Sequence, residues 1–178
     1  MTTNRATTSS TDDPAAYVAA TFATLGERDP TEVMPELLPA LREVVAMHPR
    51  AVLERPEAPG KWSVLQAIQH LADVELVFGW RVRQILTKDR PTLQGMDETA
   101  WMTRLRTGDH DLDAAMQMLS VLRQEHLRLW GTVTPAELER VGLHEERGEQ
   151  TLRDWLRTIA GHDLIHRRQI RRILETVA

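Results

Sequence analysis

The sequence predicts an all-α protein built as a four-helix bundle, with short extra helices in its long connections. Apolar residues recur at helical spacing in four long segments, at about residues 30–47, 63–87, 112–130 and 151–176. No segment shows a convincing strand pattern. Four amphipathic helices bury their apolar stripes most simply against one another, so a bundle is the simplest architecture.

The composition is that of a single globular domain. The chain has 178 residues, 42% of them hydrophobic and 27% charged, which is ordinary for a protein with a buried core. We expect one helical domain over residues 14–178, preceded by a disordered leader at residues 1–13 that lacks the features of a secretory signal. No apolar run approaches the ~18 residues of a membrane span. We therefore expect a cytoplasmic protein without a membrane partner.

The absence of cysteine narrows the possible chemistry. It excludes disulfides, thiolate metal sites and a cysteine nucleophile, so any metal ion must be held by His, Asp or Glu. The net charge of -4 at pH 7 argues against nucleic acid as a partner. We expect a small-molecule substrate as the partner, as the family resemblance described below implies.

The first part of the chain contains two helical segments. A loose apolar stripe over residues 14–25 ends at Gly26. The next helix begins with an N-cap acid, Asp29, and a proline at its first position. Pro35 and Pro39 lie inside the pattern that follows. This helix therefore either begins near Pro35 or is kinked at Pro39.

The second long helix is predicted to begin at Ser63 and to end near Thr87. Glu75 lies near the middle of its apolar face, where an ionised carboxylate is costly unless it is paired. We expect Glu75 to bind a His, an Arg or a metal ion. His70 and Arg81 lie on one flank of the same face, and a solvated helix face is the competing interpretation for Arg81.

The long connection at residues 88–109 is predicted to contain a short helix that begins at Asp97 and continues through Leu105. Loops of this length in a compact domain often cover a site. The third long helix follows and carries His126 on its apolar face. Residues 141–150 are predicted to form a polar loop.

The last helix begins with a capping box, in which Thr151 is followed by Asp154. It carries His162 and His166, four residues apart, on its apolar stripe. Side chains at this spacing lie one turn apart on the same side of a helix, so the two imidazoles can bind one metal ion. Two unrelated core histidines are the competing interpretation. The zinc-protease motif HExxH has the same spacing, but Asp163 stands where that motif has Glu.

A third ligand could come from a neighbouring helix. His70 and His126 both suit this role, and spacing alone does not choose between them. The remaining histidines lie at loops or helix ends, where we expect them to be solvated; they are His48, His110 and His144.

Three separated motifs resemble the DinB-like family of four-helix-bundle metalloproteins, of the DinB/YfiT type. They are KWSV leading to HLADVE at residues 61–75, GEQTLRDW at residues 148–155, and GH…H…QI at residues 161–170. The resemblance covers about residues 30–177. The family pattern implies that His70, His162 and His166 bind a divalent ion such as zinc or nickel, and that His126 does not.

The resemblance also implies several kinds of activity. The leading expectation is a metal-dependent transferase that uses a low-molecular-weight thiol as a cofactor, acts on a small electrophile and forms a homodimer. The alternatives are a metal-dependent small-molecule hydrolase and a non-enzymatic dimeric bundle that binds a metal or ligand. Glu75 is a candidate catalytic residue, with a buried Glu–Arg pair as its alternative. Arg81 is a candidate for binding the cofactor or a substrate carboxylate.

Overall fold

The computed structural model describes residues 13–105 and 111–178. Most of the expected leader, residues 1–12, lies outside the described residues, and so does His110. The first described residue, Asp13, already has a structural role, because its carboxylate accepts a hydrogen bond from the Ala16 amide at 3.0 Å and caps the first helix.

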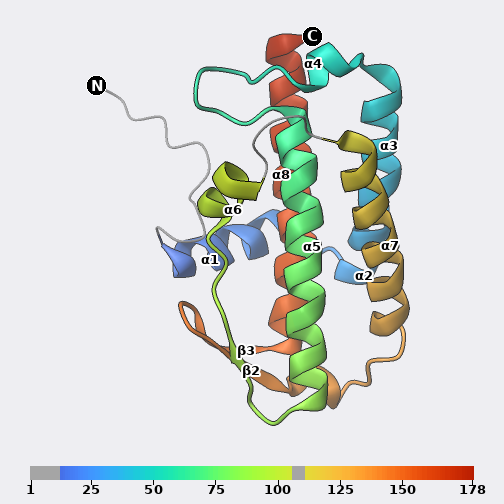
Figure 1. Cartoon of the computed structure of the whole chain (residues 1–178). Helices are drawn as coiled ribbons and strands as arrows, with labels where there is room; N and C mark the ends of the chain where they lie inside the picture. Colours follow the sequence, from blue (N-terminus) through green and yellow to red (C-terminus); the bar gives the residue numbers. More distant parts are fainter. Residues whose placement is uncertain (1–12, 106–110) are drawn as a thin grey trace.

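Four long helices form a bundle and run roughly along one direction (Figure 1). They are α3 (Leu37–Met47), α5 (Val64–Thr87), α7 (Leu112–Trp130) and α8 (Leu152–Val177). The prediction of a four-helix bundle is confirmed. Among the described residues, no helix is both long enough and apolar enough to cross a membrane.

The N-terminal helices lie across and beside the bundle. Helix α1 (Pro14–Leu25) packs against α8 and crosses its direction (Figure 1). A short helix α2 (Pro30–Val33) and a 3-10 turn η1 (Met34–Glu36) then lead into α3. Pro39 therefore stands in the first turn of α3, where its missing N–H removes no helical hydrogen bond. Of the two predicted alternatives, a helix start near Pro35 agrees better with the observed start at Leu37 than a kink at Pro39 does.

Capping boxes form at the starts of α5 and α8, and the one at α8 was predicted from the sequence. At the start of α5, the Ser63 amide donates to Gln66 Oε1 at 2.9 Å while the Ser63 hydroxyl accepts from the Gln66 amide at 3.2 Å. At the start of α8, Thr151 and Asp154 make the same reciprocal pair at 3.0 and 3.1 Å. Each box satisfies two amides that the first helical turn leaves without partners, which sets where the two long central helices begin.

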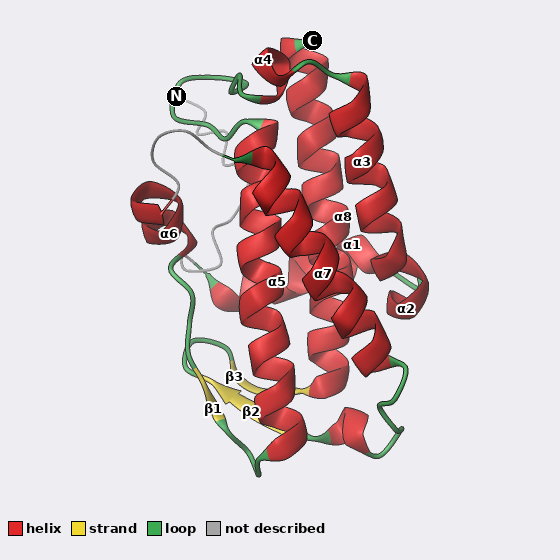
Figure 2. Ribbon diagram, turned by 45° about the vertical axis from the view of Figure 1, so that its right-hand side comes forward, coloured by secondary structure: helices red, strands yellow, loops and turns green. Residues whose placement is uncertain are grey.

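The expectation of no strand was wrong. Residues 141–150, which were predicted to be a polar loop, contain strand β2 (Val141–His144) and the start of β3 (Gly148–Thr151), which pair as an antiparallel hairpin. Strand β1 (Thr92–Leu93) adds to β2 in parallel. The three strands lie at one end of the bundle (Figure 2).

The pattern of burial explains why the segment is extended. Along β2 the side chains alternate between half-buried and buried positions, which is the period of a strand. Each strand is short, so the alternation is brief, and the charged turn between β2 and β3 obscures it in the sequence. The sheet covers the end of the bundle where Leu93 and Ile85 pack against Gly142.

The remaining short elements lie in the connections. They are α4 (Arg50–Leu53), α6 (Glu98–Leu105) and the 3-10 turn η2 (Glu137–Glu139). Helix α6 follows Asp97 as predicted, because the Asp97 carboxylate accepts from the Ala100 amide at 2.8 Å. It stands beside α5 (Figure 2).

The apolar core forms two clusters along the bundle. One joins the first half of α5 and the last part of α8 to α3 and α7. The other joins the second half of α5 and the first half of α8 to α1 and β1. Buried polar side chains gather around the boundary between the clusters; they include His70, Asp73, Glu75, Arg123, His126, His162, Asp163 and His166.

Helix α1 is seated on α8 through a glycine. A Cβ atom on Gly161 would lie 2.1 Å from the Thr21 carbonyl oxygen, far inside contact distance. Thr21 is fully buried at this crossing. The close approach of the two backbones therefore requires glycine at position 161.

We predict that Gly161→Ala separates α1 from α8 and lowers the free energy of unfolding by about 1–3 kcal/mol, as overpacking does elsewhere. The measurement is urea denaturation followed by circular dichroism. Gly131→Ala is the matched control, because its Cβ would meet its nearest atom at an ordinary 3.4 Å. Equal losses in the two variants would contradict the role of Gly161.

Candidate metal centre

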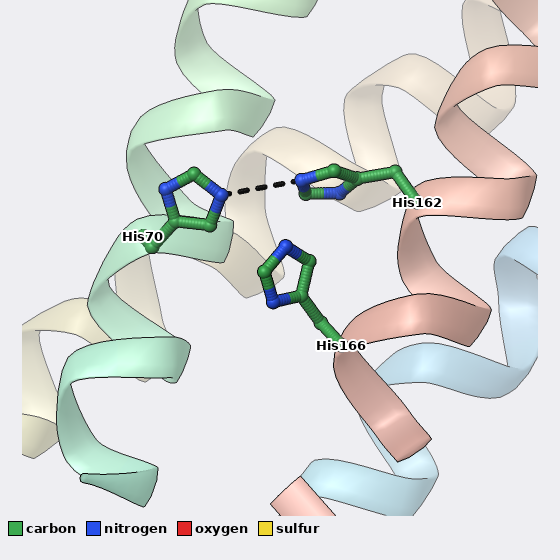
Figure 3. Close-up of side chains that lie close together, drawn as sticks. All are labelled: His70, His162 and His166. Carbon is green, nitrogen blue, oxygen red and sulfur yellow. Dashed lines mark hydrogen bonds between the residues drawn. The ribbon is translucent and has the colours of Figure 1, made fainter. Parts of the chain in front are cut away.

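Three histidines from two helices converge inside the bundle. Helix α5 carries His70, and α8 carries His162 and His166 one turn apart (Figure 3). One ring nitrogen of each lies within 4.8 Å of the other two, and all three residues are buried. The Nε2 atoms of His70 and His162 are 3.2 Å apart. The structure thus brings together the three residues that the sequence analysis named as ligands.

The spacing of these nitrogens fits a shared ion. Zinc–nitrogen bonds of about 2.0–2.1 Å in a tetrahedral site place two ligand nitrogens about 3.3 Å apart. The observed 3.2 Å is close to this separation. The Nδ1 atoms of His70 and His162 are also buried and have no hydrogen-bond partner among the described residues, so none of those residues fixes which nitrogen of these two rings carries the proton.

The third histidine is oriented by its own helix. The Gln169 side-chain carbonyl lies 2.7 Å from Nδ1 of His166 and can only accept, so this nitrogen carries the proton and donates it. The Nε2 atom of His166 therefore has its lone pair available. A hydrogen bond that fixes the tautomer of a histidine in this way is typical of metal ligands.

Burial keeps the three rings in the form that binds metals. Loss of solvation lowers the pKa of His70 and His162 well below the usual range, and the neighbouring His166 lowers both further. Burial also lowers the pKa of His166, although its hydrogen bond to Gln169 partly opposes this. Neutral imidazoles have a free lone pair at neutral pH, which is the ligating state.

Aromatic rings enclose the trio. The Trp62 ring lies 4.9 Å from that of His70 and is stacked at 6.3 Å from that of His166. The Tyr17 ring of α1 lies 6.4 Å from that of His162. These two aromatic rings therefore pack around the three imidazoles.

Glu98 joins the site, and the sequence analysis missed it. Its Oε2 atom lies 3.6 Å from His70 Nε2, and its side chain is 16% exposed. Glu98 is the first residue of α6, directly after the Asp97 cap. The sequence did contain a signal for Glu98. It is an acidic residue at the start of the short helix predicted in the connection at residues 88–109, and long connections often cover a functional site.

Two cavities open beside the trio and share Tyr17, Glu98 and His162. The larger has a volume of about 450 Å³ and extends past Trp62 and His166 toward the loop that precedes α5. The smaller has a volume of about 50 Å³ and lies between α5, α8 and the β2–β3 turn. The histidines can therefore be reached by a small molecule.

Glu75 lies in a second buried cluster, centred on Arg123 of α7. The guanidinium donates to both Glu75 oxygens at 3.0 and 2.7 Å and to both Asp163 oxygens at 2.6 and 3.1 Å. His126 Nδ1 donates to Glu75 at 2.7 Å. Among the described residues, none of the recorded hydrogen bonds of Glu75 goes to the histidine trio.

These contacts favour the alternative that was given for Glu75, a buried Glu–Arg pair, over a catalytic role. Its carboxylate is the buried partner of Arg123, which was the alternative, and the positive charge of Arg123 lowers its pKa against the opposing effect of burial. His126 belongs to the same cluster rather than to the trio. The His126 ring packs against Gly79 of α5. A Cβ atom at position 79 would lie 1.9 Å from His126 Nε2, so this packing requires glycine there.

Two other sequence expectations meet different outcomes. Arg81 is only 7% exposed and lines the smaller cavity together with His70 and His162, so it does not belong to a solvated helix face. His144 was expected to be solvated, and this was wrong. It is 3% exposed and lies in β2 against Trp155, because the strand directs it inward.

Comparisons with known proteins agree with this geometry. A family model described as the DinB superfamily matches residues 36–170. The chain is 28% identical over 138 residues to a "Putative metal-dependent hydrolase" of Geobacillus thermodenitrificans, covering 74% of this chain and 78% of that protein. It is 26% identical over 118 residues to "Putative metal-dependent hydrolase YfiT" of Bacillus subtilis, covering 66% of each.

A solved structure shows the same fold. It is described as "YfiT from Bacillus subtilis is a probable metal-dependent hydrolase with an unusual four-helix bundle topology". It superposes with a TM-score of 0.75 at 25% identity, covering 81% of this chain and 83% of that one.

We predict that Arg123→Met lowers the free energy of unfolding by about 3–5 kcal/mol, because it leaves two buried carboxylates without a counter-charge. Arg128→Met on the same helix is the control. Arg128 pairs with Glu125 at the surface, where the loss should stay below about 1 kcal/mol. Urea titrations compare the two, and similar midpoints would argue against a structural role for the Arg123 cluster.

Proposed function

The chain belongs to the DinB superfamily, and on that basis we propose that it is a metal-dependent hydrolase of a small molecule, with its ion held by His70, His162 and His166. The observation that supports this most directly is the convergence of three buried, neutral imidazoles beside open cavities. Three protein ligands leave a coordination position for water or substrate, as catalytic zinc sites do.

The reaction would combine the ion with residues of this chain. A bound divalent ion lowers the pKa of water and polarises a carbonyl group. Glu98, within 3.6 Å of a ligating nitrogen, is placed to accept the proton of the attacking water at Oε2. It then returns that proton to the leaving group.

Tyr17 is the candidate hydrogen-bond donor to the developing oxyanion. Burial raises its pKa well above the usual range, so the hydroxyl keeps its proton at neutral pH. The side chain lines both cavities beside His162. A neutral O–H in a site with little water can stabilise negative charge that forms on a substrate oxygen.

The names of the relatives support hydrolysis, the alternative in the sequence analysis, better than thiol transfer, its leading expectation. A thiol cofactor therefore has no place in this proposal. The choice between zinc and nickel, the homodimer and the cytoplasmic location stay predictions.

We predict about one divalent ion per chain in protein purified without a metal-affinity tag, and less than about 0.1 ion per chain in the His162→Ala/His166→Ala double variant. Elemental analysis makes the measurement. His48→Ala, at the end of α3, should keep its metal. Removal of the ion with a chelator should lower the melting temperature of the wild type, because the ion binds only the folded chain.

We predict that Glu98→Gln slows hydrolysis by about 10²–10⁴-fold, the usual contribution of a general base. A panel of nitrophenyl esters and anilides provides the assay. Metal content should stay near that of the wild type, because Glu98 is not one of the three ligands. Glu125→Gln, an exposed carboxylate on α7, is the control. Unchanged rates in Glu98→Gln would exclude it as the base.

A further inference from the structure

The smaller cavity beside the histidine trio contains two guanidinium groups. Arg81 comes from α5, two residues after Gly79, and Arg147 comes from the turn between β2 and β3. Both line the cavity that also contains His70 and His162. Residues far apart in the sequence thus place two positive charges next to the proposed metal centre.

The guanidinium of Arg81 is buried, and one of its N–H groups has no hydrogen-bond acceptor among the described residues. It is 7% exposed, and its Nη2 atom donates to the Gln94 carbonyl. Its Nε atom is buried and has no hydrogen-bond partner among the described residues. A buried charged donor without a partner is costly, so a buried guanidinium with a spare N–H indicates a ligand that would satisfy it.

Arg147 has the same spare donor. Its Nε atom is buried and likewise has no hydrogen-bond partner in the described part of the chain. The guanidinium lies over the Tyr17 ring at 4.9 Å and over the Trp155 ring at 5.8 Å, while that of Arg81 lies 5.1 Å from the same Trp155 ring. Stacking on aromatic faces holds both groups in position and leaves N–H edges for a ligand.

The positive charges of Arg81 and Arg147 repel each other. Burial and the charge of Arg147 together lower the pKa of Arg81 to about 10. Three carboxylates lie near enough to compensate in part, namely Glu98, Glu145 and Glu146. Glu145 and Glu146 are exposed, and Glu145 accepts from the Gly95 amide at 3.2 Å. An anion between the arginines would relieve their repulsion.

We propose that Arg81 and Arg147 bind a carboxylate of the substrate, beside the group that is hydrolysed at the histidine trio. A cavity of about 50 Å³ admits roughly three to five heavy atoms, which suits a carboxylate. Planar guanidinium forks match its two oxygens. The substrate class is therefore a small ester or amide that carries a carboxylate. Assignment to a substrate rests on the proposed hydrolase function, whereas the anion site itself does not.

The test measures binding without turnover. Zinc-loaded protein is titrated with butyrate, butyramide and inorganic phosphate, and the indole N–H resonance of Trp155, assigned with Trp155→Phe, reports occupancy by NMR. We expect saturable binding of butyrate, and at least about 10-fold weaker binding of neutral butyramide. Arg81→Gln and Arg147→Gln should each weaken butyrate binding by about 10- to 100-fold.

Arg153→Gln is the control for overall charge, because Arg153 is exposed and pairs with Glu139. It should leave the dissociation constant for butyrate nearly unchanged. Arg81 is buried and its replacement could unfold the chain, so Arg147→Gln, in a half-buried turn, provides the independent variant. Preserved amide spectra identify folded variants.

Several outcomes would overturn the proposal. Butyrate could fail to bind, or bind equally well to the wild type and the folded Arg147→Gln variant, as it would if it contacted only the metal. If phosphate bound more tightly than butyrate through the same arginines, the site would be one for a tetrahedral anion and not for a carboxylate. Butyrate binding that depends on the arginines, in a protein with no esterase or amidase activity, would refute the proposed function but keep the anion site.

Discussion

Desolvation of polar side chains in the middle of the bundle is the constraint on which the rest of the structure depends. Three imidazoles and the Arg123 cluster are buried around the boundary between two apolar clusters. Burial keeps the imidazoles neutral, and the carboxylates of Glu75 and Asp163 compensate the charge of Arg123. The same low-dielectric region can therefore hold a metal site on one side and a structural ion cluster on the other.

The site is completed by segments outside the helices that carry the ligands. Tyr17 comes from α1, which lies before the part of the chain that matches the family model. Its position depends on Gly161, which lets α1 approach the backbone of α8 next to His162. Glu98 comes from α6 and Arg147 from the β-hairpin. The bundle thus provides the proposed metal ligands, while α1 and the connections provide the groups that would act on a substrate.

The two cavities define how a substrate of the proposed reaction would lie across the histidine trio. The smaller has fixed positive charges and little room, and the larger has about 450 Å³ of space. Both reach His162, Glu98 and Tyr17. A substrate anchored by an anionic group in the smaller cavity would place its reacting bond near the trio and its leaving group toward the larger one. Such anchoring converts binding energy into orientation.

The sequence by itself determined the elements whose signals are local. Apolar periodicity located α5, a capping box located the start of α8, and the spacing of His162 and His166 put both on one inward face. Spacing could not choose between His70 and His126, and it did not reveal the hairpin, Glu98 or Arg147. Those depend on which helix faces meet and where connections fold back. Only tertiary packing decided them, because it joins residues whose separation along the chain carries no period.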